Sequence, residues 1–355
     1  MNKSHGLKFI KNYAYNHIAP SVKRPTYAYL TITSLCNSQC NYCGMWKNKK
    51  ENEPTTEEWK RIINDIAKIG AVTLTFSGGE PFLRSDLFEL ASHAKSQGLL
   101  TMVVTNLSLF NKNHVEKIVE NFDFIGISLD TIHPEMYIEI RGKDWLEQIK
   151  QNIHLLMDGL STLKAETEVS AVVTLSNRNA DEIHELIHMV FDELNMDTIT
   201  FNLLDPNGGP KAKEFIPTYE QLQYFKQVIL DHKSLYPISN SKRYFNQLGH
   251  FDYKCNPWKC VQIDHKGFLI TPCLFFNEHQ INLREQRLSD VWKSKHIQKM
   301  YSQYNNCKTC NLGCVAESAW STSDINFIIN EGFLGIIIPT TKRIRNRLQN
   351  EKRYK

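Results

Sequence analysis

The sequence lacks the features by which exported and membrane proteins are usually identified. No segment supplies the roughly 20 consecutive apolar residues that a membrane-spanning helix needs. The first residues, MNKSHGLKFIKNYAYNHIAP, contain neither a long apolar run nor a small-residue cleavage site, as a signal peptide would. A formal net charge of +4 over 355 residues is small, which argues against a dedicated nucleic-acid-binding face. We therefore expect a cytoplasmic protein that does not bind nucleic acid.

Cysteine is absent from the middle of the chain, although the sequence contains 9 cysteines. One group lies near the start, and the other lies in the last third: Cys36, Cys40 and Cys43, then Cys255, Cys260, Cys273, Cys307, Cys310 and Cys314. In a reducing cytosol, cysteines grouped in this way are more often metal ligands or redox groups than disulfide partners.

Internal repeats and low-complexity stretches are also absent, and the first two thirds alternate short apolar strands with helical patterns. This alternation predicts βα units and a parallel sheet. The expected strands are residues 27–33, 72–76, 99–104, 124–129, 168–175 and 198–203. A helix is expected to begin at a Thr55/Glu58 capping box and to end at Gly70, and others are expected near 85–97, 113–121, 144–158, 180–194 and 218–232.

Six such units predict a partial (β/α)6 barrel, where a complete barrel has eight. Each expected strand runs into a polar stretch, and the carboxyl ends of barrel strands converge on one mouth. After about residue 235 the βα rhythm gives way to spaced cysteines, which predicts a small domain organised more by metal than by a core. We therefore divide the chain into an extension at 1–25, a barrel at 26–235, a cysteine-rich domain at 236–322 and an apolar, then basic, tail at 323–355.

Two motifs follow the first two expected strands. Cys36, Cys40 and Cys43 form a C-x3-C-x2-C loop, whose three thiolates suit three irons of a [4Fe–4S] cube and leave the fourth iron open to a small molecule. The second strand ends in Ser-Gly-Gly-Glu-Pro at 77–81, where paired glycines let backbone approach a ligand closely. For the cysteine loop the alternatives are three buried thiols and an opportunistic metal site. For the glycine stretch the alternative is an ordinary turn.

Together, and in this order, the two motifs resemble those of the radical S-adenosylmethionine (radical SAM) superfamily, which also has a partial barrel. The resemblance covers about residues 27–204. It implies that Cys36, Cys40 and Cys43 hold the cluster and that S-adenosylmethionine chelates its open iron. It also implies cofactor contacts from the aromatic position before the last cysteine and from successive strand ends: Tyr42, Gly78, Gly79, Glu80, Thr105, Asn106, Ser128, Asp130 and the 175–177 segment.

The later cysteines resemble the auxiliary-cluster domains called SPASM or, in shortened form, twitch. Cys255, Cys260, Cys273, Cys307, Cys310 and Cys314 would be the ligands. Five residues separate Gly267 from Cys273 where four are usual, and six cysteines are present where the full pattern has seven. One fully ligated cluster, two clusters with an open or non-cysteine position, and a structural zinc site at the last three cysteines therefore remain alternatives.

Two further features are expected to be structural. His184 and His188 lie four residues apart on an expected helix, and because no partner is apparent we predict a solvated helix face there. The basic tail is expected to be a docked helix, with contact to an anionic membrane surface as the alternative.

The resemblance implies an enzyme that, once reduced by a donor such as flavodoxin or ferredoxin, cleaves S-adenosylmethionine to methionine and a 5′-deoxyadenosyl radical. That radical would remove a hydrogen atom from a substrate C–H bond, with one or more auxiliary [4Fe–4S] clusters assisting. The expected substrate is a sugar, a lipid-linked compound or another small molecule, because the stretch before the first strand is short for a leader-peptide-binding domain. The alternatives are a maturase of ribosomally made peptides and a non-catalytic iron–sulfur electron carrier.

Overall fold

The structure is a computed structural model that describes residues 3–18, 22–49, 52–249, 255–273, 276, 279–304, 307 and 317. Its strands are β1 (Tyr27–Thr33), β2 (Thr73–Gly78), β3 (Leu100–Thr105), β4 (Phe124–Ser128), β5 (Glu168–Leu175), β6 (Thr198–Leu203), β7 (Cys260–Ile263), β8 (Phe268–Thr271) and β9 (His279–Asn282). All six strands expected from the sequence are present, each within a residue or two of the expected bounds.

The α-helices are α1 (Lys3–Ile18), α2 (Thr56–Lys68), α3 (Leu87–Ser96), α4 (His114–Asn121), α5 (Pro134–Arg141), α6 (Leu146–Thr162), α7 (Ile183–His188), α8 (Tyr219–His232), α9 (Lys242–Asn246), α10 (Leu288–Val291) and α11 (Lys295–Gln303). Short 3-10 turns are η1 (Met45–Lys47), η2 (Pro81–Leu83), η4 (Ala212–Phe215) and η5 (Pro257–Lys259), and η3 (Met189–Glu193) is a π-helical turn that continues α7. None of the helices among these described residues is both long and apolar enough to cross a lipid bilayer.

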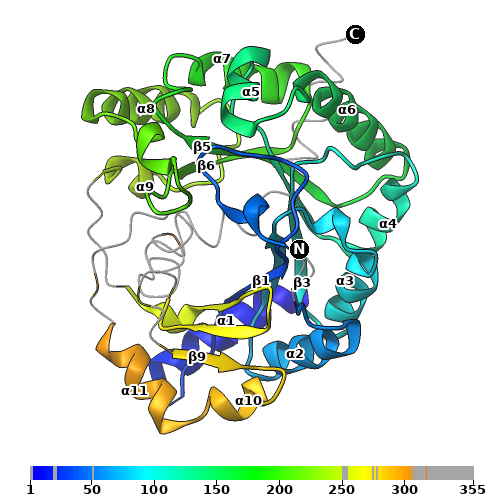
Figure 1. Ribbon diagram of the computed structural model, residues 1–355, viewed down its shortest axis with the longest axis vertical. Coiled ribbons are helices and arrows are strands. Elements are labelled where there is room, and N and C mark those ends of the chain that lie inside the picture. Colours follow the sequence, from blue (N-terminus) through cyan, green and yellow to red (C-terminus); the bar gives the residue numbers. More distant parts are fainter. Residues whose placement is uncertain are drawn as a thin grey trace.

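One sheet runs through the molecule in the order β6-β5-β4-β3-β2-β1-β7-β8-β9. The strands from β1 to β6 are parallel neighbours, so their carboxyl ends lie along one edge. In Figure 1 the helices α2, α3, α4, α6, α7 and α8 follow one another around the outside of this curved sheet. The partial barrel predicted from the sequence is confirmed, and the sheet is open, because β6 and β9 end the strand order.

The helix α2 shows why the local sequence folds as it does. The side chain of Thr55 accepts a hydrogen bond from the backbone N–H of Glu58, and the Glu58 carboxylate accepts one from the backbone N–H of Thr55 at 2.8 Å. This reciprocal cap satisfies two donors that the first turn would otherwise leave unpaired. The helix then buries one apolar face against the sheet: Trp59, Ile62, Ile63 and Ile66. Beyond it, Gly70 adopts a φ of 103°, which only glycine takes readily.

The region after residue 235, for which the sequence predicted a small domain organised more by metal than by a core, continues the sheet of the barrel. Its strand β7 pairs in parallel with β1, and β8 and β9 add antiparallel strands beyond it. Its apolar side chains join the same hydrophobic core as the barrel, among them Val261, Leu269, Leu288, Trp292 and Ile297. Sequence spacing missed this arrangement because strands of four residues show too little alternation to reveal which strand they pair with. The expected tail at 323–355 lies outside the described residues.

Trp292 tests whether this C-terminal region and the barrel share one core. Its indole is 1% exposed, donates to the carbonyl of Lys23 at 2.8 Å and lies 5.3 Å from the ring of Tyr301. We expect Trp292→Ala to lower the free energy of unfolding of the barrel helices by about 3–5 kcal/mol, because a large buried side chain is lost. Urea unfolding followed by circular dichroism measures this, with Lys293→Ala at the exposed neighbouring position as the control. Equal barrel stability in the two variants would contradict the shared core.

Candidate functional site

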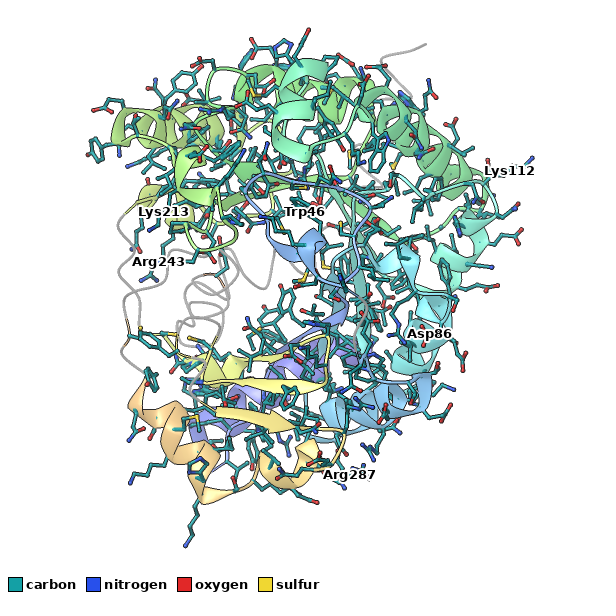
Figure 2. The ribbon with its side chains drawn as sticks, in the orientation of Figure 1. Trp46, Asp86, Lys112, Lys213, Arg243 and Arg287 are labelled. Atoms are coloured by element: carbon teal, nitrogen blue, oxygen red, sulfur yellow. The ribbon has the colours of Figure 1, made fainter. Side chains whose placement is uncertain are left out.

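The cysteine loop, residues 34–49, leaves β1 at the carboxyl edge of the sheet. In Figure 1 this blue segment, with its turn η1, crosses the centre of the ring of helices, and in Figure 2 Trp46 marks its place there. The indole of Trp46 donates to the carbonyl of Cys40 at 3.1 Å. Cys40 is buried, and Cys36 and Cys43 are partly buried; all three are free thiols. The loop therefore presents three unpaired sulfurs at the mouth of the barrel.

The glycine turn after β2 is packed directly on this loop. The backbone N–H of Gly79 donates to Thr33 at 2.9 Å, and that of Glu80 donates to the carbonyl of Leu35 at 2.7 Å. A Cβ atom at Gly79 would lie 1.9 Å from that same carbonyl oxygen, and one at Gly78 would lie 2.4 Å from the oxygen of Thr33. No side chain fits in either space, so the two glycines are needed for the turn and the loop to touch.

Glu80 lies under the mouth and not on its surface, since it is 1% exposed. Its carboxylate accepts from the hydroxyl of Thr105 at 2.7 Å and from the backbone N–H groups of Asn106 at 2.8 Å and Phe82 at 3.1 Å. Burial raises the pKa of Glu80 above its usual value, and these donors oppose the rise. Three residues that the sequence placed at the cofactor site, Glu80, Thr105 and Asn106, are thus brought together, and Glu80 positions the end of β3.

Asn37 extends this contact into the cysteine loop. The side-chain amide of Asn106 donates to the Asn37 oxygen at 2.9 Å, and the amide of Asn37 donates to the hydroxyl of Ser108 at 2.8 Å. Neither Asn37 nor Ser108 was predicted as a site residue. Their positions in a loop and after a strand are common for hydrogen-bonding side chains, and only the folded chain shows that they meet.

Asp130 forms a second buried link to the cysteine loop. It is fully buried; its carboxylate pairs with the guanidinium of Arg141 at 2.5 Å and accepts from the hydroxyl of Tyr42 at 2.8 Å. Its other oxygen accepts from the backbone N–H of Thr174 at 2.8 Å. Arg141 also reaches the sulfur of Cys40 at 3.7 Å, so a buried cation lies beside one predicted cluster ligand. Ser128, the other predicted residue at this strand end, is the last residue of β4.

Arg141 is a further residue of this site that sequence reasoning missed. It ends α5, a helix that was not expected, although Pro134 at its first turn and Gly142 after its last are typical helix-boundary signals. The carbonyls of Ile140 and Arg141, which the helix itself leaves without partners, accept the backbone N–H groups of Asn41 at 3.0 Å and Gln39 at 3.1 Å. The carboxyl end of α5 therefore orders the backbone of the cysteine loop.

A second glycine pair approaches the loop from the β6 side. The N–H of Gly44 donates to the carbonyl of Gly208 at 3.2 Å, and a Cβ atom at Gly209 would lie 2.7 Å from the carbonyl carbon of Cys43. The cysteine loop is thus held by the ends of β2, β3, β4 and β6 and by α5. The 175–177 segment, which the resemblance placed at the cofactor site, contacts the turn η4: the backbone N–H of Asn177 donates to the carbonyl of Phe215 at 3.0 Å.

These surroundings fit a metal centre with an open position. Burial raises the pKa of the Cys36 thiol to about 11 and also raises that of Cys43, so both are protonated at neutral pH until a metal displaces the protons. Three thiols on a loop fixed from five sides can hold three irons, and residues 34–49 contain no fourth cysteine, which leaves one iron open to a small ligand.

One of the later cysteines, Cys260, lies at the opposite end of β1 from the cysteine loop. Cys260 pairs in register with Tyr27, the first residue of β1, which places it about 20 Å from the loop at about 3.3 Å per residue. Burial raises the pKa of the Tyr301 phenol, and Cys260 and Cys273 add to this, so both thiols lie near one phenol. Cys255 is buried and Cys307 partly buried, whereas Cys310 and Cys314 lie outside the described residues.

The buried pair of Asp130 and Arg141 can be tested against a more exposed pair, Glu139 and Arg178, since Arg141 and Glu139 both lie on α5. Asp130→Asn is expected to cost about 3–5 kcal/mol of unfolding free energy, because Arg141 is left as an unpaired buried cation. The half-exposed pair of Glu139 and Arg178 is the matched control, and Glu139→Gln is expected to cost about 0–1 kcal/mol. Urea unfolding of the two variants provides the comparison. Similar small losses in both would show that Asp130 does not hold the loop.

Comparison with known protein families and structures adds independent information. Residues 30–190 match the family described as "Radical SAM superfamily", and residues 207–331 match a "Domain of unknown function (DUF3463)", here the SPASM/twitch-like region. The chain is 30% identical over 232 residues to a Methanosarcina barkeri "Fe-coproporphyrin III synthase". The aligned region covers 64% of this chain and 54% of that protein. The chain thus spans about half the length of that relative.

Two other similarities extend over more of the chain. An "AdoMet-dependent heme synthase" of Methanosarcina barkeri is 24% identical over 326 residues, covering 82% of this chain and 92% of that protein. Streptococcus suis SuiB, in a crystal structure with S-adenosylmethionine, superposes with a TM-score of 0.66 at 16% identity over 81% of this chain and 70% of SuiB, which establishes a shared fold. Residues 30–190 thus form a radical SAM domain, the domain of a superfamily of enzymes that use a [4Fe–4S] cluster and S-adenosylmethionine.

Proposed function

We propose that Cys36, Cys40 and Cys43 hold a [4Fe–4S] cluster at which the chain binds S-adenosylmethionine and cleaves it reductively. The observation that carries this proposal is the direct packing of the glycine turn on the cysteine loop, where Gly79 leaves no room for a Cβ atom. A cluster held by these three cysteines would supply one electron to the sulfonium of bound S-adenosylmethionine; the products would be methionine and a 5′-deoxyadenosyl radical, which would take a hydrogen atom from a substrate C–H bond.

In this proposal the residues of the chain bind S-adenosylmethionine and orient it at the cluster. Gly78, Gly79 and Glu80 are assigned to the methionine amine, the first two through backbone and the third through position, since the Glu80 carboxylate is buried. Thr105, Asn106, Ser128, Asp130 and Tyr42 surround the same mouth and complete the proposed cofactor site. Arg141 beside Cys40 stabilises negative charge on the thiolate ligands.

We propose a small molecule as substrate, a sugar, a lipid-linked compound or a related metabolite, and a flavodoxin or ferredoxin as electron donor. The heme synthase relative, similar over most of its length, supports an enzyme acting on a small molecule. Peptide modification is the second candidate, favoured by the fold shared with SuiB. A second SuiB structure, bound to the precursor peptide SuiA, superposes on this chain with a TM-score of 0.65. The alternative of a non-catalytic electron carrier loses its support, because the relatives that carry the matched domain are enzymes.

The later cysteines are proposed to hold one or more auxiliary clusters. The length of β1 separates Cys260 from the cysteine loop, so a cluster there suits electron exchange better than direct contact with a substrate placed beside the radical. The boundaries at 25, 235 and 322 and a contact of the tail with a membrane surface stay predictions from the sequence.

The first test needs no knowledge of the substrate. Reconstituted protein with S-adenosylmethionine and a strong reductant is expected to form 5′-deoxyadenosine slowly under anaerobic conditions, as measured by chromatography. Cys40→Ala is expected to abolish the product, because two thiolates cannot hold the cube with one open iron. Cys307→Ala is the matched control and is expected to retain most of this uncoupled reaction. No product from wild-type protein with a full iron complement, with or without candidate substrates, would contradict the proposal.

The second test concerns Glu80. Glu80→Ala leaves the hydroxyl of Thr105 and the N–H of Asn106 without their buried acceptor, and so disturbs the strand end that lines the proposed cofactor site. We expect S-adenosylmethionine to bind at least about 10-fold more weakly while iron and sulfide contents stay at the wild-type level. Equilibrium dialysis measures the affinity, and Glu139→Ala on the exposed surface is the control. Unchanged affinity in Glu80→Ala would show that the cofactor does not occupy this mouth.

A further inference from the structure

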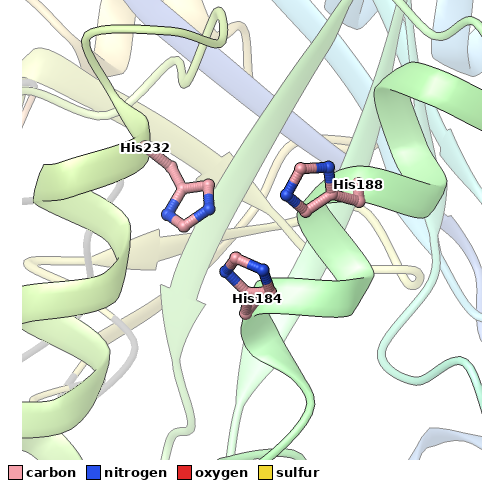
Figure 3. A group of neighbouring side chains, drawn as sticks. All are labelled: His184, His188 and His232. Carbon is pink, nitrogen blue, oxygen red and sulfur yellow. The ribbon is translucent and has the colours of Figure 1, made fainter.

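Three histidines that the proposed reaction does not use meet on the outer helical layer. His184 and His188 lie on α7, and His232 is the last residue of α8. One ligating atom from each lies within 4.8 Å of those of the other two, and Figure 3 shows the three rings gathered between the two helices. The sequence predicted a solvated helix face at His184 and His188, on the assumption that no partner lies near them. His184 is exposed, but that assumption is wrong, because His232, more than 40 residues away in the chain, is brought beside them by the packing of α8 on α7.

The hydrogen bonds of His188 and His232 leave one nitrogen of each ring free to bind a metal ion. Nδ1 of His232 contacts the carbonyl oxygen of Val228 at 2.7 Å, and since a carbonyl only accepts, Nδ1 carries the proton. Nδ1 of His188 contacts the carboxylate of Asp192 at 2.8 Å, which likewise accepts. In each neutral ring Nε2 then carries the lone pair, which is the form that ligates metal ions.

Asp192 and Tyr236 form the outer support that metal-binding histidines usually have. The Asp192 carboxylate accepts from His188 and, at 3.1 Å, from the hydroxyl of Tyr236, whose ring packs face to face on Phe191 with 4.9 Å between centroids. A carboxylate on the far nitrogen fixes the ring's orientation and makes the ligating nitrogen more basic. The turn η3 brings Asp192 into this position four residues after His188.

The size of the cluster suits one ion of the zinc class. Nitrogens bound to one tetrahedral Zn²⁺ at about 2.0–2.1 Å lie about 3.4 Å from one another. Side-chain movements of about 1 Å would therefore bring the three imidazole nitrogens to the spacing that zinc requires. His184 is exposed, which leaves the fourth position to water or to a solvent-borne ligand. The described residues around the rings include one carboxylate within hydrogen-bond distance, that of Asp192, and no cation is paired with it.

The site lies away from the barrel mouth. After α8 the chain turns, and Ile238 bridges in parallel to Ile199 near the start of β6, at the amino edge of the sheet. His232 at the end of α8 is therefore near the edge opposite to the one that carries the cysteine loop. We propose that His184, His188 and His232 bind one divalent transition-metal ion of the zinc class through their imidazole nitrogens, with Asp192 orienting His188, and that this ion clamps α7 to α8.

Zinc uptake by the full-length, anaerobically reconstituted protein tests this proposal. Excess Zn²⁺ is added and free metal removed, and zinc, iron and sulfide are then counted. Wild-type protein is expected to keep about one zinc more than His184→Ala. His184 is exposed, so its loss is not expected to unfold the chain. Zinc bound at cysteines is common to both proteins, and the difference between them therefore isolates the histidine site.

Three further variants sharpen the result. His184→Cys replaces one zinc ligand with another and is expected to restore the extra zinc. Asp192→Asn is expected to weaken zinc binding about 10- to 100-fold without removing it. His154→Ala, an exposed histidine on α6, is the matched control and is expected to bind zinc as wild type does. Equal zinc in wild type and His184→Ala, or an equal loss in His154→Ala, would overturn the proposal. Formation of 5′-deoxyadenosine by His184→Ala is expected at the wild-type rate, so failure here is separate from failure of the proposed function.

Discussion

The buried ion pair between Asp130 and Arg141 is the interaction on which the candidate site depends. A loop without regular structure must be held by side chains or by neighbouring backbone, because it lacks the repeating backbone hydrogen bonds of a helix or a sheet. Asp130 joins β4, β5 through Thr174 and the loop through Tyr42, and its partner Arg141 reaches Cys40. Two charges inside a protein are costly unless their hydrogen bonds are satisfied, and here the carboxylate has a partner at each oxygen. The same pair therefore fixes the loop and places positive charge beside the sulfur of Cys40.

Close backbone contact completes the arrangement from the other sides. Gly79 and Gly209 each occupy a place where a Cβ atom would collide with the backbone of the cysteine loop. The carbonyls at the end of α5 accept the loop's N–H groups. Rigid contacts of this kind keep three thiols at fixed positions before any metal is bound, which lowers the ordering cost of assembling a cluster.

The sheet also relates the two groups of cysteines. Because β7 extends the sheet in parallel with β1, Cys260 lies at the amino end of β1 and the cysteine loop at its carboxyl end. The C-terminal region is thus continuous with the barrel in both hydrogen bonding and core packing. The histidine cluster lies on the outer layer near the amino edge, so the molecule presents three distinct groups of potential metal ligands.

Local sequence determined much of this protein. The six parallel strands, the capped helix α2, the C-x3-C-x2-C loop and the glycine turn are each encoded within a few neighbouring residues, because periodicity, capping and turn chemistry act over that range. Contacts between distant segments depended on the tertiary structure: the pairing of β7 with β1, the insertion of Arg141 between Asp130 and Cys40, and the approach of His232 to His184 and His188. Such contacts are set by how whole helices and strands pack, and spacing along the chain carries no signal for that.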